Sequence, residues 1–252
     1  MTSADGHVGG RHTPSSLTLS LPPRDLRVIQ DVGRFRQLSA WQIGELHFSA
    51  VRSATPLDRT LKRLTTSKHL VRLERPRGGV GGGSAQLVYQ LGRVGWKLLG
   101  KTGDYWVPKS VNLHTLAVGN WFVQLNQASR SGAFEVLDFL TESAAHKKVG
   151  TIQLTPDALM TLGFGQRGSG ETLSYWVEVD RGTERAEVIQ EKCVRYWNAY
   201  DTAWPPDEVF PLILFVVPDD RRKQEIERVI KGGPDAAQGL FEVCLMTEIP
   251  AF

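Results

Sequence analysis

A small set of acidic residues in the second half of the chain has the types and spacing that metal-dependent chemistry needs. Asp157 follows a proline, and Glu178 and Asp180 stand two positions apart at the end of an apolar segment. In a strand, residues two positions apart point to the same face, so these two acids are expected to share one site. Hydrolysis of a phosphodiester with Mg²⁺ requires converging carboxylates that hold the ion beside the scissile phosphate. The pattern predicts that all three acids act as catalytic residues and as metal ligands.

Lys192 and Tyr196 extend this candidate site as further catalytic residues. They are four positions apart, so they share one face of the helix that should follow the strand. The pattern of acids resembles the motif of the PD-(D/E)XK nuclease-like fold. The spacing of Lys192 and Tyr196 is like the polar-x-x-x-Tyr element in the exonuclease branch of that superfamily. That pattern expects a lysine at position 180 to stabilise charge on the attacked phosphate, so Lys192 would have to supply the missing cation.

The same residues also have purely structural interpretations, and these stay open at the level of sequence. Asp157 is also explained as a turn cap, Glu178 and Asp180 as a salt-bridged strand end, and Lys192 as a solvated helix position. If the three acids do meet, their mutual repulsion must be offset either by a metal ion or by Lys192. Because Asp180 replaces the expected lysine, we favour the second outcome.

Alternating strand-like and helix-like segments are predicted to position these residues. The expected order of elements is helix, three strands, helix, strand, helix, strand. Such an order is typical of an α/β (α+β) domain with a mixed sheet and helices on both faces. The segments are helix 114–128, strands 134–140, 158–162 and 173–180, helix 186–200, strand 209–217, helix 219–230 and strand 241–247.

The first half of the chain has a different order, with three helices followed by a hairpin. Ser39 is placed to cap the second helix, and Thr55 with Pro56 to begin the third. This order predicts a winged helix-turn-helix. The segments are helices 21–35, 39–46 and 55–66, strands 70–77 and 87–91 around a glycine-rich tip at 78–83, and a further helix at 92–99.

Basic side chains on the third helix and beside the tip predict contact with double-stranded DNA. A short helix with one basic face suits a major groove about 12 Å wide, and glycines let backbone amides approach phosphates. The alternatives are that the domain is a protein-interaction module and that the tip is an ordinary loop. The predicted DNA-binding residues are Arg52, Thr55, Arg59, Thr60, Lys62, Arg63, Arg75 and Arg77.

Charge divides the 252-residue chain into two unlike parts beneath a net charge of +3. Residues 21–110 contain 16 Lys and Arg against 6 Asp and Glu, whereas residues 111–252 contain 13 against 20. A basic part is the electrostatic footprint of a polyanion binder, although a solvated basic face has the same composition. The two cysteines form no Cys-x-x-Cys pair, which argues against a zinc site and fits a reducing cytoplasm.

Other classes of protein find little support in the residues. No apolar run approaches the ~20 residues of a membrane span, and the polar start lacks the apolar core of a secretory signal. The glycine run at 78–83 lacks the Gly-Lys-Ser/Thr ending of a phosphate-binding loop, and no nucleophile elbow supports Ser/His/Asp catalysis.

Fragments along most of the chain share one further pattern. Over about residues 21–200, the sequence is similar to the replication-relaxation family of plasmids and integrative mobile elements. The resemblance implies a role in replication or transfer. It also adds a role in the site as a second interpretation of His114, which is otherwise an ordinary residue at a helix start. The fragments are Leu21-Pro-Pro-Arg-Asp-Leu-Arg-Val-Ile29, Leu38-Ser-Ala-Trp-Gln-Ile43, Leu61-x-x-Leu64, Gly82-Gly-Ser-Ala-x-x-Val-Tyr-x-Leu91, Leu113-His114-Thr-Leu116, Pro156-Asp157-Ala158 and Glu178-Val-Asp-Arg-Gly-Thr-Glu184, followed by Lys192 and Tyr196.

Two functions from different classes follow from these observations. The first is a DNA-binding replication or transfer protein whose nuclease-like part is inactive and has no cofactor. The second is a Mg²⁺-dependent nickase or nuclease targeted by its winged helix. In either case we expect duplex DNA as the partner, with a homodimer or other replication or transfer proteins as further candidates. The expected parts are a disordered arm at 1–20, a winged helix at 21–100, a linker at 101–112 and a nuclease-like domain at 113–252.

Overall fold

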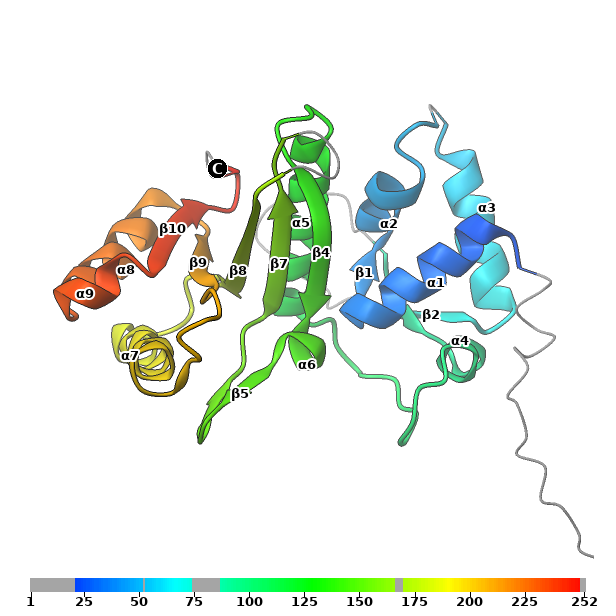
Figure 1. Ribbon diagram of the computed structural model, residues 1–252. Helices are drawn as coiled ribbons and strands as arrows, with labels where there is room; N and C mark the ends of the chain where they lie inside the picture. The colour runs from blue at the N-terminus through cyan, green and yellow to red at the C-terminus, as the bar shows by residue number, and fades with distance from the viewer. Residues whose placement is uncertain (1–20, 52, 74–86, 166–169, 250–252) are drawn as a thin grey trace, which may run out of the picture.

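The protein is a mixed α/β structure with a small N-terminal sheet and a larger C-terminal one (Figure 1). The computed structural model describes residues 21–51, 53–73, 87–165 and 170–249. Within these ranges, no helix is both long and apolar enough to pass through a lipid bilayer.

The N-terminal part contains the three helices and the paired strands that the sequence predicts. Strands β1, β3 and β2 form an antiparallel sheet in that order. Its elements are α1 (Pro23–Phe35), β1 (Leu38–Ser39), α2 (Ala40–His47), α3 (Thr55–Thr66), β2 (Leu70–Leu73), β3 (Val88–Leu91) and α4 (Arg93–Leu98). The glycine-rich tip at 78–83 lies outside the described residues.

Two helix starts were predicted from capping residues, and they turn out differently. Ser39 caps α2 in a capping box, because its hydroxyl accepts from the backbone N–H of Gln42 and the Gln42 side chain accepts in return. Thr55 is not a cap, because it is the first residue of α3 and Ala54 occupies the cap position. Proline therefore occupies the second helical position, where its missing N–H is still harmless.

The C-terminal part is built on a five-stranded mixed sheet in the order β10-β9-β8-β7-β4. The three strands β8, β9 and β10 run parallel, whereas β7 is antiparallel to both of its neighbours. The strands are β4 (Glu135–Thr141), β7 (Ala158–Gly163), β8 (Thr172–Val179), β9 (Leu212–Val217) and β10 (Phe241–Leu245). Strand β9 begins later than the predicted residue 209, which fits Pro211, because proline cannot donate to a sheet.

Helices cover both faces of this sheet, as the alternation of side chains along β8 requires. Tyr175, Val177 and Val179 pack on the face covered by α5, and Trp176 and Glu178 point toward α7. The helices are α5 (Leu113–Ser129), α7 (Ala186–Ala203), α8 (Asp220–Lys231) and the short α6 (Glu142–Ala145) and α9 (Asp235–Gln238). A hairpin of β5 (Lys147–Val149) and β6 (Ile152–Leu154) was not predicted.

Helix α5 joins the two parts of the molecule, since it packs on the large sheet and on the N-terminal helices (Figure 1). The Gln42 amide of α2 donates to the Leu116 carbonyl and to Asn120 Oδ1, each at 2.7 Å. Gly119 lies beside this amide, where an added Cβ would stand 2.8 Å from Gln42 Nε2. Phe122 of α5 packs 5.1 Å from the ring of Phe35, so one hydrophobic core spans both parts.

Candidate functional site

Asp157 lies just before β7 and connects two elements at one end of the sheet. Its Oδ1 is 2.8 Å from His114 Nε2, and its Oδ2 accepts the backbone N–H of Val179 at 2.8 Å. Asn112 caps α5 by accepting from the N–H groups of His114 and Thr115, which fixes His114 in the first helical turn. The hydrogen bond that His114 donates to Asp157 raises the pKa of His114 above its usual value, against the effect of burial.

Glu178 is buried one strand away from Asp157 and is held by two residues of α7. Lys192 Nζ donates to Oε2 at 3.0 Å, and the Tyr196 hydroxyl donates to Oε1 at 2.7 Å. Burial raises the pKa of Glu178 to about 7, since Lys192 and Tyr196 offset only part of the cost of removing the carboxylate from water. Burial acts against the charge on Lys192 as well, but the two nearby glutamates outweigh it and raise the pKa of the lysine.

Asp180 is drawn into a different cluster, at the start of α8. Arg222 donates through Nε to Asp180 Oδ2 at 2.7 Å and through Nη2 to the same oxygen, and both side chains are buried. Glu184 connects this cluster to the first one. Its carboxylate lies 2.9 Å from Lys192 Nζ, and its carbonyl oxygen accepts from Arg222 at 2.8 Å.

The structure thus brings four of the five predicted catalytic residues together and gives the fifth a separate partner. Asp157 and Glu178 lie on neighbouring segments, as the hydrogen bond from Asp157 N–H to the Val177 carbonyl shows, and Lys192 and Tyr196 face Glu178. Asp180 is held by Arg222 instead.

The three predicted metal ligands already have other partners. His114 and a backbone N–H hold Asp157, Lys192 and Tyr196 hold Glu178, and Arg222 holds Asp180. In the parts of the chain that the structure describes, no group of three His, Cys, Asp or Glu side chains is placed to hold a metal ion. Binding of Mg²⁺ stays a prediction, and in this arrangement it would require the displacement of Lys192 or Arg222.

The predicted DNA-binding residues of α3 divide into an exposed group and an engaged pair. Thr55, Arg59 and Lys62 are exposed. Thr60 is buried, and Arg63 donates to both oxygens of the buried Asp25 at 2.7–2.9 Å and to the Thr60 hydroxyl at 3.2 Å. Arg63 therefore joins α3 to α1, and the Thr60 hydroxyl helps to hold its guanidinium in place. Arg52, Arg75 and Arg77 lie outside the described residues.

Three residues of these clusters were missed or left open by the sequence analysis. Glu184 belongs to the seven-residue fragment that ends at it, so its position in a motif was a usable signal. His114 was open between two roles, and the structure places it on Asp157. Arg222 has no local signal, since its partner is 42 positions away along the chain.

The fold and these clusters define a class of mixed α/β protein with a basic helical front part and buried carboxylates at one end of its main sheet. The family model for replication-relaxation proteins matches residues 29–213, and the chain belongs to that family. This membership supports a role in plasmid or mobile-element replication or relaxation. Neither the curated proteins nor the solved structures contain a match to the chain.

Proposed function

We propose that this protein binds duplex DNA in plasmid or mobile-element replication or transfer, with its N-terminal part acting as a winged helix. The observation that carries the proposal is the outward face of α3. Arg59 and Lys62 are exposed there and make no ion pair with any other described residue, so both cations are available to phosphates. The order of three helices and a paired β2–β3 further supports this assignment.

The second part of the proposal is that the C-terminal part is a nuclease-like scaffold without catalytic activity. Its mixed sheet with helices on both faces supports the PD-(D/E)XK likeness. An active site of that type needs carboxylates free to bind a metal ion. Here Lys192 and Arg222 neutralise two of the three acids directly, which favours a structural role for them.

A mobility-shift assay at low salt tests DNA binding without knowledge of the target sequence, because phosphate contacts do not depend on sequence. The Arg59→Ala/Lys62→Ala protein should bind a mixed-sequence duplex more weakly, with a salt dependence reduced by about one unit of slope for each lost phosphate contact. Arg221→Ala is the matched control, since Arg221 is also an exposed helical arginine, on α8. Equal binding by the double variant and the parent would contradict the proposal.

A Mg²⁺-dependent nickase is the second candidate, because Asp157 lies near enough to Glu178 to raise its pKa and His114 contacts Asp157. Incubation of supercoiled plasmid with the protein and Mg²⁺ or Mn²⁺ separates the two candidates. The scaffold proposal expects no relaxed or linear product. Nicking by the parent protein that is lost in Asp157→Asn would establish the enzyme instead.

A further inference from the structure

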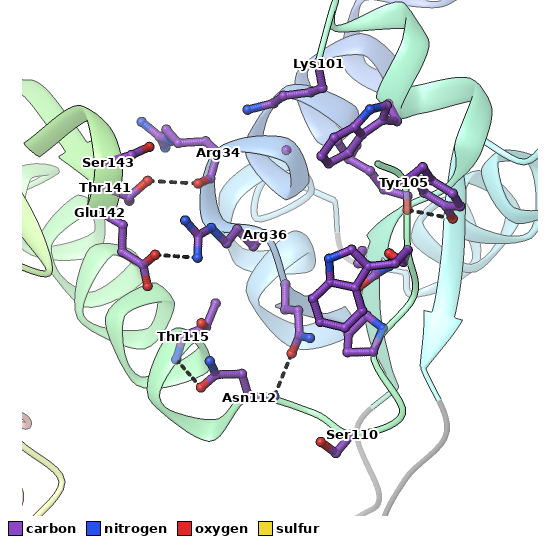
Figure 2. Close-up of a pocket in the computed structure, with 17 residues that line it drawn as sticks. Arg34, Arg36, Lys101, Tyr105, Ser110, Asn112, Thr115, Thr141, Glu142 and Ser143 are labelled. Carbon is purple, nitrogen blue, oxygen red and sulfur yellow. Dashed lines mark hydrogen bonds and ion pairs between the residues drawn. The ribbon is translucent and has the colours of Figure 1, made fainter. Parts of the chain in front are cut away.

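A cavity of about 660 Å³ lies where the two parts of the molecule meet, and it is lined by none of the acidic residues of the site described above. It opens between the end of α1, the segment 101–112 and the start of α6, as Figure 2 shows. Its volume is in the range of about 300–1,000 Å³ that small-molecule sites have. The cavity is lined by aromatic, cationic and neutral polar side chains, and these come from both parts of the chain.

The aromatic wall is formed mostly by the segment 101–112. Trp96 and Tyr105 pack edge to face with ring centroids 6.0 Å apart. The Tyr105 hydroxyl donates to the Leu91 carbonyl at 3.3 Å, and Gln90 Nε2 donates to the Trp106 carbonyl at 3.2 Å. Two hydrogen bonds therefore hold this segment against β3, while the residue Trp106 remains 69% exposed. A tryptophan that is fixed through its backbone and open at its ring is a ready surface for stacking.

Positively charged side chains also line the cavity. Arg34, Arg36 and Lys101 line it, and Glu142 is the only acidic residue among the described lining residues. Arg36 forms an ion pair with Glu142 across the cavity, yet its side chain stays largely exposed (Figure 2). Lys101 is exposed and makes no ion pair with any other described residue. Arg34 is already engaged, because its Nη2 pairs with Asp31 at 2.9 Å and its guanidinium lies over the Phe35 and Phe122 rings. The cations open to an entering anion are therefore Lys101 and the exposed Arg36.

The backbone at this ion pair is unusual on both sides. Arg36 has φ +66° and Glu142 has φ +25°, and both values lie in the region that non-glycine residues seldom adopt. Such conformations persist where the surrounding structure imposes them, and they gather at binding sites. The Thr141 hydroxyl donates to the Arg34 carbonyl at 2.8 Å and joins the two strained segments.

We propose that this cavity binds a nucleoside phosphate, with the base stacked on Trp106 and the phosphate beside Lys101 and Arg36. Stacking on an aromatic ring accepts any base, and the cations supply the attraction for the phosphate. The ligand is either a free nucleotide or one nucleotide of a single strand, and both present the same chemistry. None of these residues lies on α3, so the proposal does not depend on how the protein binds a duplex.

Binding of three probes to the full chain tests this proposal. The probes are a short fluorescent oligothymidylate followed by anisotropy, dTMP as a competitor, and inorganic phosphate as a second competitor. We expect Trp106→Ala and Lys101→Ala each to weaken oligothymidylate binding about tenfold or more, and Trp106→Phe to restore most of it. Tyr200→Ala is the control for Trp106, as a partly exposed aromatic residue of α7, and Arg221→Ala is the control for Lys101. Thermal melts confirm that each variant is folded.

The competitors identify the source of the ligand. Competition by dTMP indicates a free nucleotide, and oligothymidylate binding without such competition indicates a single strand. The proposal is overturned if no probe binds, if Trp106→Ala binds as the parent does, or if phosphate alone competes as well as dTMP. Duplex binding that survives in Trp106→Ala separates this site from the face of α3, so the two proposals fail independently.

Discussion

The outward face of α3 and the acidic end of the large sheet are both rich in charge. The charges on α3 are exposed and, in the part of the chain that the structure describes, unpaired, whereas those at the sheet end are buried and paired. On α3, Arg59 and Lys62 point into solvent without an ion-pair partner among the described residues. At the sheet end, Glu178 and Asp180 are buried, and each has a cation within hydrogen-bond distance. Charges that satisfy one another hold a fold together, whereas unpaired cations on a surface remain available to a partner.

Burial is the physical reason for this difference. A carboxylate removed from water must be paired or hydrogen-bonded, or it takes up a proton. An exposed cation stays hydrated and needs no partner, since a surface ion pair contributes only about 0–1 kcal/mol. The fraction of exposed surface, more than the number of charged residues, therefore separates the two regions.

The largest expected effect comes from Lys192→Met, which removes the cation from Glu178. Breaking a buried ion pair on one side costs about 3–5 kcal/mol, and we expect the lower end of that range, because Lys192 is partly exposed and Tyr196 still donates to Glu178. Urea unfolding measures the loss. Lys148→Met on the hairpin is the control, as an exposed lysine.

This loss should also depend on pH. The pKa of Glu178 is raised by burial to about 7, so the folded state holds a proton there at a pH where the unfolded chain has released it. Stability from this group therefore falls as pH rises toward 7, and Lys192→Met should be most destabilising above that value. A deficit that is equal at about pH 5 and about pH 8, or one that Mg²⁺ removes, would contradict the role given to Lys192.

Arg63→Ala is expected to have the next largest effect. It tests whether α3 carries a cation that stabilises the fold as well as cations that remain unpaired. It leaves the buried carboxylate of Asp25 without its partner, and we expect a loss on the order of 2 kcal/mol, because the arginine itself is half-exposed. The free energy of unfolding from urea titration gives the value. Arg59→Ala on the same helix is the control and should leave stability unchanged.

Arg59→Ala is expected to have the opposite profile, with weaker duplex binding and normal stability. The loss of affinity should be on the order of 1 kcal/mol for a phosphate contact and should shrink at high salt. Fluorescence anisotropy with a labelled duplex measures it. If Arg59→Ala unfolds more easily, or if its affinity matches the parent at low salt, the contrast within α3 does not hold.

The smallest expected effect concerns the proton on His114. Asp157 raises its pKa, so His114 stabilises the fold below its ordinary pKa of 6.5, and this contribution is lost as pH rises through the higher folded value. Asp157→Asn should return the titration midpoint toward 6.5. NMR of the imidazole protons follows the midpoint directly. An unchanged midpoint would mean that the contact between His114 and Asp157 does not hold the proton.

Periodicity was sufficient to predict the long elements, whereas short ones lacked the signal. Strand β8 has apolar residues on both faces and was predicted within one residue of each end. The β5–β6 hairpin has three residues in each strand, and its lysines hide the alternation, so the sequence did not predict it. A strand of that length is stable only through its neighbours, which the sequence does not display.

The candidate site could likewise be predicted only where its residues are close together in the sequence. Lys192 and Tyr196 are four positions apart on a helix, so their shared face followed from spacing alone. The partners of Asp180 and Arg63 lie 42 and 38 positions away, and no local pattern points to them. Asp180 directly follows β8 instead of ending it, and it was assigned to Asp157 and Glu178, whereas Arg222 holds it.

The contacts of α5 bear on how such a chain can evolve. Gln42 reaches from α2 to the backbone of α5, and Gly119 leaves just enough room for its amide. The ring of Phe35 lies against Phe122 in a core that both parts share. An N-terminal part transplanted from a distant relative would bring a mismatched surface to α5 and leave a gap or a clash. New specificity is therefore expected to arise by substitution on exposed positions such as Arg59, and not by exchange of the N-terminal part as an independent cassette.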